Sequence, residues 1–158
     1  MSPLSISPNT AYWLDKIADA YTPLLLIIAV VEICLSWRRG QRMHLVYLVY
    51  AVTIVYSLMF ADERWGFWGS IGLDYSTHSA ASFCLVVVIC WYKNASAWLF
   101  VATTLVAYGL LMYILNYHSW LDMFTTVLAC ALCLLPVGIR RIRQLRASKL
   151  SSANLVAG

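Results

Sequence analysis

The sequence predicts an all-α protein, a polytopic transmembrane helix bundle of about five spans preceded by an N-terminal amphipathic interfacial helix. Its 158 residues are 62% hydrophobic and 11% charged, whereas soluble domains average about 45–50% apolar and about 25% charged residues. Such a chain lacks the polar surface that a water-soluble particle needs. Five apolar stretches, each bounded by polar or basic segments, make up most of its length.

Residues 1–21 are expected to provide the interfacial helix. Apolar side chains recur at helical spacing between residues 8 and 21, and Asp15, Lys16 and Asp19 lie on the other side of that helix. The segment is too short and too charged to cross a bilayer. Tyr12 and Trp13 suit the boundary between lipid and water.

Residues 22–139 are expected to form the transmembrane catalytic bundle. The predicted spans cover residues 22–37, 43–60, 78–92, 97–117 and 119–138. Short loops at 38–44 and 93–96 join the first and second spans and the third and fourth, and a polar, aromatic connection covers 61–77. Residues 140–158 are expected to be a basic cytoplasmic tail with a disordered end.

The basic residues predict the orientation of the chain. Eight of the eleven Lys and Arg side chains lie in two clusters, at residues 38–42 and 140–149. Clusters beside apolar runs are topology signals rather than nucleic-acid sites, and the basic side is the cytoplasmic one. The protein is therefore expected in the inner (cytoplasmic) membrane, with its N-terminus outside and its C-terminus in the cytoplasm.

Two polar clusters, at residues 74–83 and 117–122, fall on the predicted outer side, and each lies at the mouth of an apolar span. His118 and Asp122 are four residues apart, which would place them on one face of a helix. A carboxylate beside an imidazole orients its tautomer and raises its basicity. His78, protonated, could give a proton to a leaving oxygen. These residues predict phosphoryl chemistry on a lipid.

The two clusters resemble signatures of the type 2 phosphatidic acid phosphatase superfamily. Residues 76–83, which read STHSAASF, are similar to its second signature, and residues 117–122, which read YHSWLD, to its third. The motifs also resemble those of the sphingomyelin synthases. The resemblance implies a lipid phosphatase or headgroup phosphotransferase without a cofactor. His118 would be the nucleophile that forms a phosphohistidine, Asp122 would orient it, and His78 would protonate the leaving group.

The substrate expected from this resemblance is a lipid phosphate or a phospholipid. The positions of the superfamily's Ser-Arg pair are occupied here by Leu111 and Met112, and its first signature has no match. We therefore expect Arg64, Ser76 and Asp74 to form the substrate-binding set.

Two alternatives compete with this interpretation. Asp74, His78, His118 and Asp122 are a ligand set suited to zinc or another divalent metal, which predicts a metal-dependent membrane hydrolase. A non-catalytic accessory protein or transporter would instead depend on Glu32, an ionisable residue within the first span.

Overall fold

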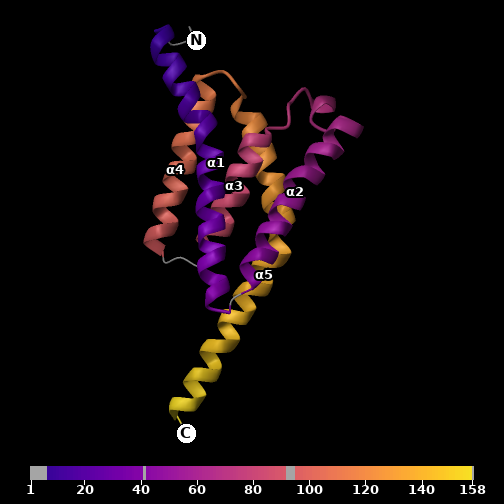
Figure 1. Ribbon diagram of the computed structural model, residues 1–158. Helices are drawn as coiled ribbons and strands as arrows, with labels where there is room; N and C mark the ends of the chain where they lie inside the picture. The colour runs from indigo at the N-terminus through magenta and orange to yellow at the C-terminus, as the bar shows by residue number, and fades with distance from the viewer. Residues whose placement is uncertain (1–6, 41, 92–94, 158) are drawn as a thin grey trace.

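The computed structural model describes residues 7–40, 42–91 and 95–157, and all regular elements in these ranges are helical. The elements are α1 (Pro8–Arg38), α2 (Met43–Trp65), the short 3-10 helix η1 (Gly69–Ile71), α3 (Thr77–Cys90), α4 (Ala95–Ile114) and α5 (Trp120–Ala157) (Figure 1). The predicted helical bundle is confirmed. Helices α1, α2, α4 and α5 are long and apolar enough to cross a membrane, so the chain is an integral membrane protein.

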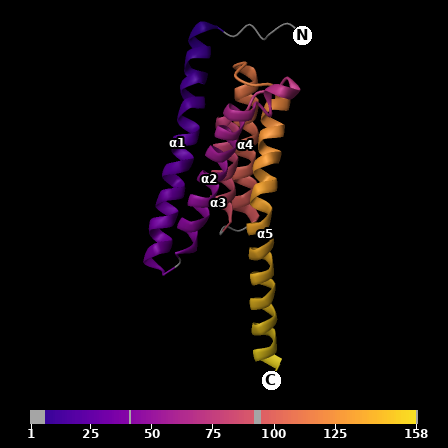
Figure 2. The ribbon, with the colours of Figure 1, turned by 90° about the vertical axis from the view of Figure 1, so that its right-hand side faces the viewer.

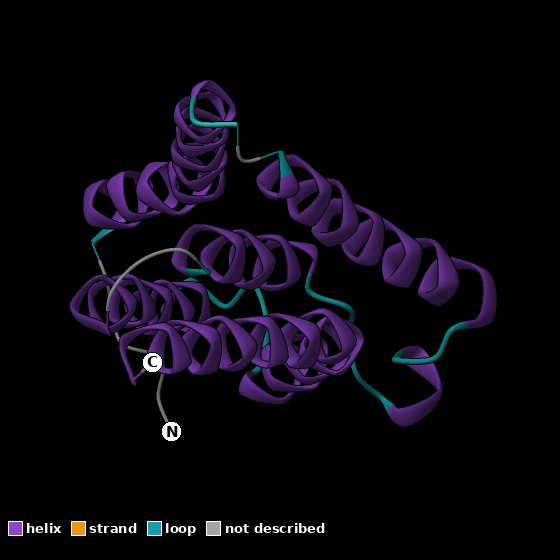
Figure 3. Cartoon of the chain, turned by 90° about the horizontal axis from the view of Figure 1, so that it is seen from below, coloured by secondary structure: helices purple, strands orange, loops and turns teal. Residues whose placement is uncertain are grey.

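Helix α3 lies at the centre of the bundle. It packs against α1, α2, α4 and α5, and most of its side chains are buried. Figure 3 shows the bundle of helices from below. Its 14 residues make a helix about 21 Å long at about 1.5 Å per residue. The hydrocarbon core of a bilayer is about 30 Å thick. At least one end of α3 is therefore recessed within the protein.

The interfacial helix and the first span, which the sequence predicts as separate segments, form the single helix α1. Ser7 caps it, because its side-chain oxygen accepts a hydrogen bond from the Thr10 N–H at 3.2 Å. Pro23 lies inside the helix. A proline there removes one hydrogen bond to the preceding turn, but no glycine or second cap accompanies it, and α1 continues to Arg38.

Helix α5 continues well past the predicted end of the last span. Pro136 and Gly138 lie within it, and its helical backbone reaches Ala157. The expectation of a disordered end to the tail is therefore wrong for the part of that end that the structure describes, which is helical as far as Ala157. This segment is rich in Arg, Leu and Ala, which favour helix even without packing partners. Figure 2 shows it extending beyond the other helices.

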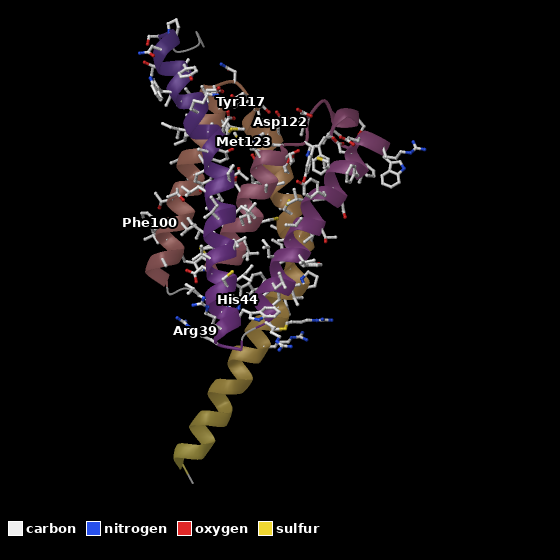
Figure 4. All side chains as sticks on the ribbon, viewed as in Figure 1. Arg39, His44, Phe100, Tyr117, Asp122 and Met123 are labelled. Carbon is white, nitrogen blue, oxygen red and sulfur yellow. The ribbon has the colours of Figure 1, made fainter. Side chains whose placement is uncertain are left out.

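The connections gather at the two ends of the bundle as the charge pattern requires. Tyr117 and Asp122 lie at one end, and Arg39 and His44 at the other (Figure 4). The start of α1, the connection from α2 to α3 and the connection from α4 to α5 share the end that carries Asp122 (Figure 1). The predicted loop at 93–96 lies largely outside the described residues.

The connection from α2 to α3 is fixed by specific bonds. Gly66 ends α2 in the left-handed conformation, with φ of 62°, where glycine has no steric penalty. Trp68 donates from its backbone N–H to Asp62 Oδ1 at 2.8 Å and from its indole to Thr125 Oγ1 at 3.0 Å. The Tyr75 hydroxyl donates to the Val55 carbonyl at 2.9 Å. These bonds set where the polar cluster before α3 enters the bundle.

Candidate functional site

His118 lies in a turn between helices and not on a helix. Asn116 adopts the left-handed conformation, with φ of 58°, which asparagine tolerates better than most residues. The Tyr117 N–H donates to the Met112 carbonyl at 3.1 Å, so the end of α4 is capped before His118. Helix α5 begins only at Trp120. The expectation that His118 and Asp122 share one helical face is therefore wrong.

Asp122 closes the start of α5 by a reciprocal pair of hydrogen bonds. Its Oδ2 accepts from the Ser119 N–H at 2.8 Å, and its own N–H donates to Ser119 Oγ at 3.2 Å. This is a capping box, in which a serine and an acidic residue three positions later satisfy each other's backbone donors. Asp122 Oδ1 accepts from the Asp74 N–H at 2.9 Å. One buried carboxylate thus joins the start of α5 to the segment before α3.

The carboxylate that approaches His118 is that of Asp74. Asp74 Oδ2 lies 3.7 Å from His118 Nδ1, and that nitrogen is buried without a hydrogen-bond partner among the described residues. The His118 side chain is 14% exposed and that of Asp74 is 76% exposed. Asp74, which the sequence suggests for substrate binding, is therefore placed to orient the imidazole of His118.

The start of α3 is held by buried hydroxyls. Ser76 is its N-cap, and Ser76 Oγ accepts from the Ser79 N–H at 3.3 Å and donates to Ser79 Oγ at 2.8 Å. The Ser76 N–H donates to Thr126 Oγ1 at 3.1 Å. Ser76 is fully buried, and its hydroxyl already caps the helix. It positions His78, which follows two residues later and is exposed.

His78 and His118 line one cavity of about 180 Å³. We call it the histidine cavity. Its complete lining is Ala18, Asp19, His78, Tyr108, Met112, Tyr117 and His118. Two histidines that are 40 positions apart in the sequence thus converge on one space, as the sequence predicts for a common site.

A second cavity of about 280 Å³ opens on the other side of His118. We call it the aspartate cavity, and its lining is Asp74, Tyr113, Asn116, Tyr117, His118, Ser119 and Asp122. His118 and Tyr117 line both cavities. His118 therefore forms part of the wall between a space that carries His78 and a space that carries Asp74 and Asp122.

Three side chains of α1 and α4 contribute to this site and were not identified from the sequence as site residues. Asp19 lines the histidine cavity, and Asp15 accepts a hydrogen bond from the Tyr117 hydroxyl. The i, i+4 spacing of these aspartates on one helical face was the available signal. Tyr108 is 4% exposed. Its ring stacks on Tyr21 with centroids 4.3 Å apart.

Arg64, the cation expected near the substrate, lies away from the cavities. Arg64 is exposed in the last turn of α2, and it lines neither the histidine cavity nor the aspartate cavity. Lys16 is also exposed, with its ammonium 3.8 Å from Asp19 Oδ2 and 5.7 Å from the centre of the Tyr12 ring. Lys16 therefore partly neutralises Asp19 from outside the cavity.

The structure also locates the residues of the two alternative interpretations. Within the described ranges, no three His, Cys, Asp or Glu side chains are grouped so as to hold a metal ion. The zinc alternative stays a prediction that metal analysis of the purified protein would test. Glu32 is half-buried in α1 and is engaged in interactions, as is the buried His44.

No family model matches the chain, and neither a curated protein nor a solved structure matches it. The functional argument therefore depends on the residues and on the geometry of the two cavities.

Proposed function

We propose that the protein is a membrane-embedded lipid phosphatase or headgroup phosphotransferase that acts through a phosphohistidine on His118. The observation that carries this proposal is the convergence of His78 and His118 on one cavity, with a carboxylate oxygen 3.7 Å from His118 Nδ1. A nucleophile, a proton donor and an orienting carboxylate are the groups that such a transfer requires.

In the first half of the reaction, His118 Nε2 attacks the phosphorus of the lipid substrate. The bond from phosphorus to the lipid or headgroup oxygen breaks, and that oxygen takes a proton from the imidazolium of His78. Asp74, which faces Nδ1, stabilises the positive charge that develops on the His118 ring. The motif resemblance gives this orienting role to Asp122, but the geometry favours Asp74.

In the second half, a hydroxyl group attacks the phosphohistidine and the N–P bond breaks. His78, now neutral, takes the proton of the attacking hydroxyl. Water as the attacking group gives hydrolysis, and a lipid hydroxyl gives headgroup transfer. We place the site on the outer face of the inner membrane, because Arg39, which follows Arg38 at the end of α1, lies at the opposite end of the bundle from Asp122 (Figure 4).

Turnover of a lipid panel tests the proposal. Purified protein in lipid nanodiscs is given phosphatidate, a lysophosphatidate, isoprenoid phosphates and phosphodiester lipids, and both phosphate release and headgroup transfer are measured. We expect His118→Ala to abolish turnover and His78→Ala to lower it about 10²- to 10⁴-fold, the usual contribution of a general acid.

His44→Gln provides the matched control, because His44 lies at the other end of the bundle (Figure 4). Because His44 is buried and engaged in interactions, turnover is compared per folded protein, and we expect it to stay within a few-fold of the wild type. Substrate labelled on phosphorus should leave acid-labile label on wild-type protein and none on His118→Ala. Full turnover by folded His118→Ala protein would refute the mechanism.

A further inference from the structure

An apolar groove adjoins the histidine cavity. It has a volume of about 300 Å³ and lies between α3, α4 and α5. Helices α4 and α5 both pack on α3 (Figure 1), and the stacked rings of Tyr113 and Trp120, with centroids 5.1 Å apart, bridge the two helices. The apolar groove lies between the helices, with Gly109 and Trp120 among its lining residues.

The lining of the groove is almost entirely apolar and is open at its rim. Val106 of α4 is 63% exposed and Phe124 of α5 is 64% exposed, and both line the groove. In a membrane protein, apolar side chains exposed at this depth face lipid. The groove therefore opens sideways to the hydrocarbon chains of the bilayer.

Tyr108 connects the groove to the candidate site. It lines both the groove and the histidine cavity, so the two spaces meet at this side chain. Ser79, which follows His78 on α3, also lines the groove.

We infer that this groove holds the single hydrocarbon tail of the substrate, which enters from the membrane between α4 and α5 with its phosphate in the histidine cavity. The inference rests on the proposed function and names the substrate class as phosphorylated lipids with one linear tail, whether monoester or diester. The apolar pocket among α1, α2 and α3, with a volume of about 250 Å³, shares no lining residue with the histidine cavity. This pocket therefore does not continue the histidine cavity as the apolar groove does through Tyr108.

Gly109 is the position at which a side chain can be added to the groove without a close contact at its Cβ. A Cβ added at Gly109 would meet only Trp120 Cζ3, at 3.8 Å, which is ordinary van der Waals contact. Gly109→Leu places a larger side chain in the groove, and leucine is a better helix former than glycine. Ala107→Leu is the matched control, because Ala107 is exposed and lies about 200° around the helix from Gly109.

The test uses a hexadecylphosphonate with a diazirine near the end of its tail, because the proposed reaction does not cleave its C–P bond. We expect saturable photolabelling of wild-type protein on the groove-lining segments of α4 and α5. Gly109→Leu should weaken binding at least tenfold, and Ala107→Leu should change it less than twofold. Equal binding by both variants, or labelling confined to the pocket among α1, α2 and α3, would overturn the inference.

Turnover separates this inference from the proposed function. If Gly109→Leu lowers kcat/KM for long single-tailed phosphates and leaves a short-chain phosphate ester unaffected, both are supported. If the phosphonate binds as expected but wild-type protein turns over no lipid, the proposed function fails and the groove stands as a lipid-binding site. If lipids are turned over equally by Gly109→Leu and wild type, the groove assignment fails alone.

Discussion

Replacing Asp122 should reduce the stability of the protein, whereas replacing Asp74 should reduce its activity. The Asp122 carboxylate is 8% exposed and accepts two backbone hydrogen bonds, at 2.8 Å from Ser119 and at 2.9 Å from Asp74. The Asp74 side chain accepts no such bond among the described residues, and it is 76% exposed beside His118. The motif resemblance assigns the catalytic carboxylate to position 122, so the two variants distinguish the two assignments.

The expected loss in the free energy of unfolding follows from the hydrogen bonds that each variant removes. A hydrogen bond to a charged group contributes about 1.5–3 kcal/mol. Asp122→Ala removes two, and because water can reach part of this turn we take the lower value for each, about 3 kcal/mol in total. In a chain of this length that corresponds to a fall in melting temperature of about 6–12 °C. Asp122→Asn keeps one acceptor oxygen and should lose about half as much.

Asp74→Asn should change the free energy of unfolding by less than about 1 kcal/mol, because exposed ion pairs contribute little. Loss of a carboxylate that orients a catalytic histidine can cost about 10⁴ in rate. The separation of 3.7 Å in this pair is long, so we expect a fall in kcat of about tenfold or more. The His118→Ala variant sets the background rate.

Thermal unfolding followed by circular dichroism and turnover of the best lipid substrate measure the two effects on the same preparations. A stable, inactive Asp122→Asn beside a fully active Asp74→Asn would refute the reasoning and restore the assignment that the motif implies. Inactive variants at both positions with unchanged melting temperature would show that both carboxylates act on His118.

Two further predictions concern residues that the structure adds to the site. Asp19→Asn should tighten binding of a phosphate monoester about fivefold, because removing one charge near 4 Å in a water-like environment changes the free energy of binding by about 1 kcal/mol. Equilibrium binding of hexadecylphosphonate measures this affinity. An unchanged affinity would place the phosphate elsewhere. Tyr75→Phe should lower the free energy of unfolding by about 1 kcal/mol, since the bond to the Val55 carbonyl is lost, while lipid turnover stays the same. Burial raises the pKa of the Tyr75 phenol, so this group remains a donor at any pH that the protein survives, and the effect should not depend on pH.

The helical bundle could be predicted because hydropathy acts locally. Each apolar stretch produces its own helix, whatever surrounds it, and the Lys and Arg clusters order the connections. The sequence predicts an interfacial helix and a separate first span, but the structure has one continuous helix. This could not be predicted, because Pro23 lies between the two segments and yet removes only one hydrogen bond without ending α1. The tail is helical to Ala157, because the helix propensity of its residues outweighs the polar composition from which we expected disorder.

The site was predicted in part for a similar reason. Charge-derived topology placed His78 and His118 at one membrane face, and their shared cavity agrees with that prediction. The roles of Asp74 and Asp122 depended on whether residues 118–122 form one helix, and the left-handed backbone of Asn116 decides this. The same residues, Ser119 to Asp122, also read as a capping box, so the alternative role of Asp122 was present in the sequence. Asp19 and Tyr108 enter the site only through tertiary packing.

The charges around the two cavities bear on which phosphate the site favours. Among the described residues, Asp19, Asp74 and Asp122 line these cavities and no Lys or Arg does. Of the described residues that line these cavities, His78 and His118 are therefore the ones that can carry positive charge beside the phosphorus. A phosphate monoester carries up to two negative charges and is repelled by the carboxylates about twice as strongly as a phosphodiester, which carries one. Within the proposed function, this balance favours a phosphodiester lipid over a monophosphate and headgroup transfer over simple phosphate release.

Because the repulsion scales with substrate charge, Asp19→Asn should improve turnover of monoesters more than that of diesters, and equal improvement would show that Asp19 does not face the phosphate.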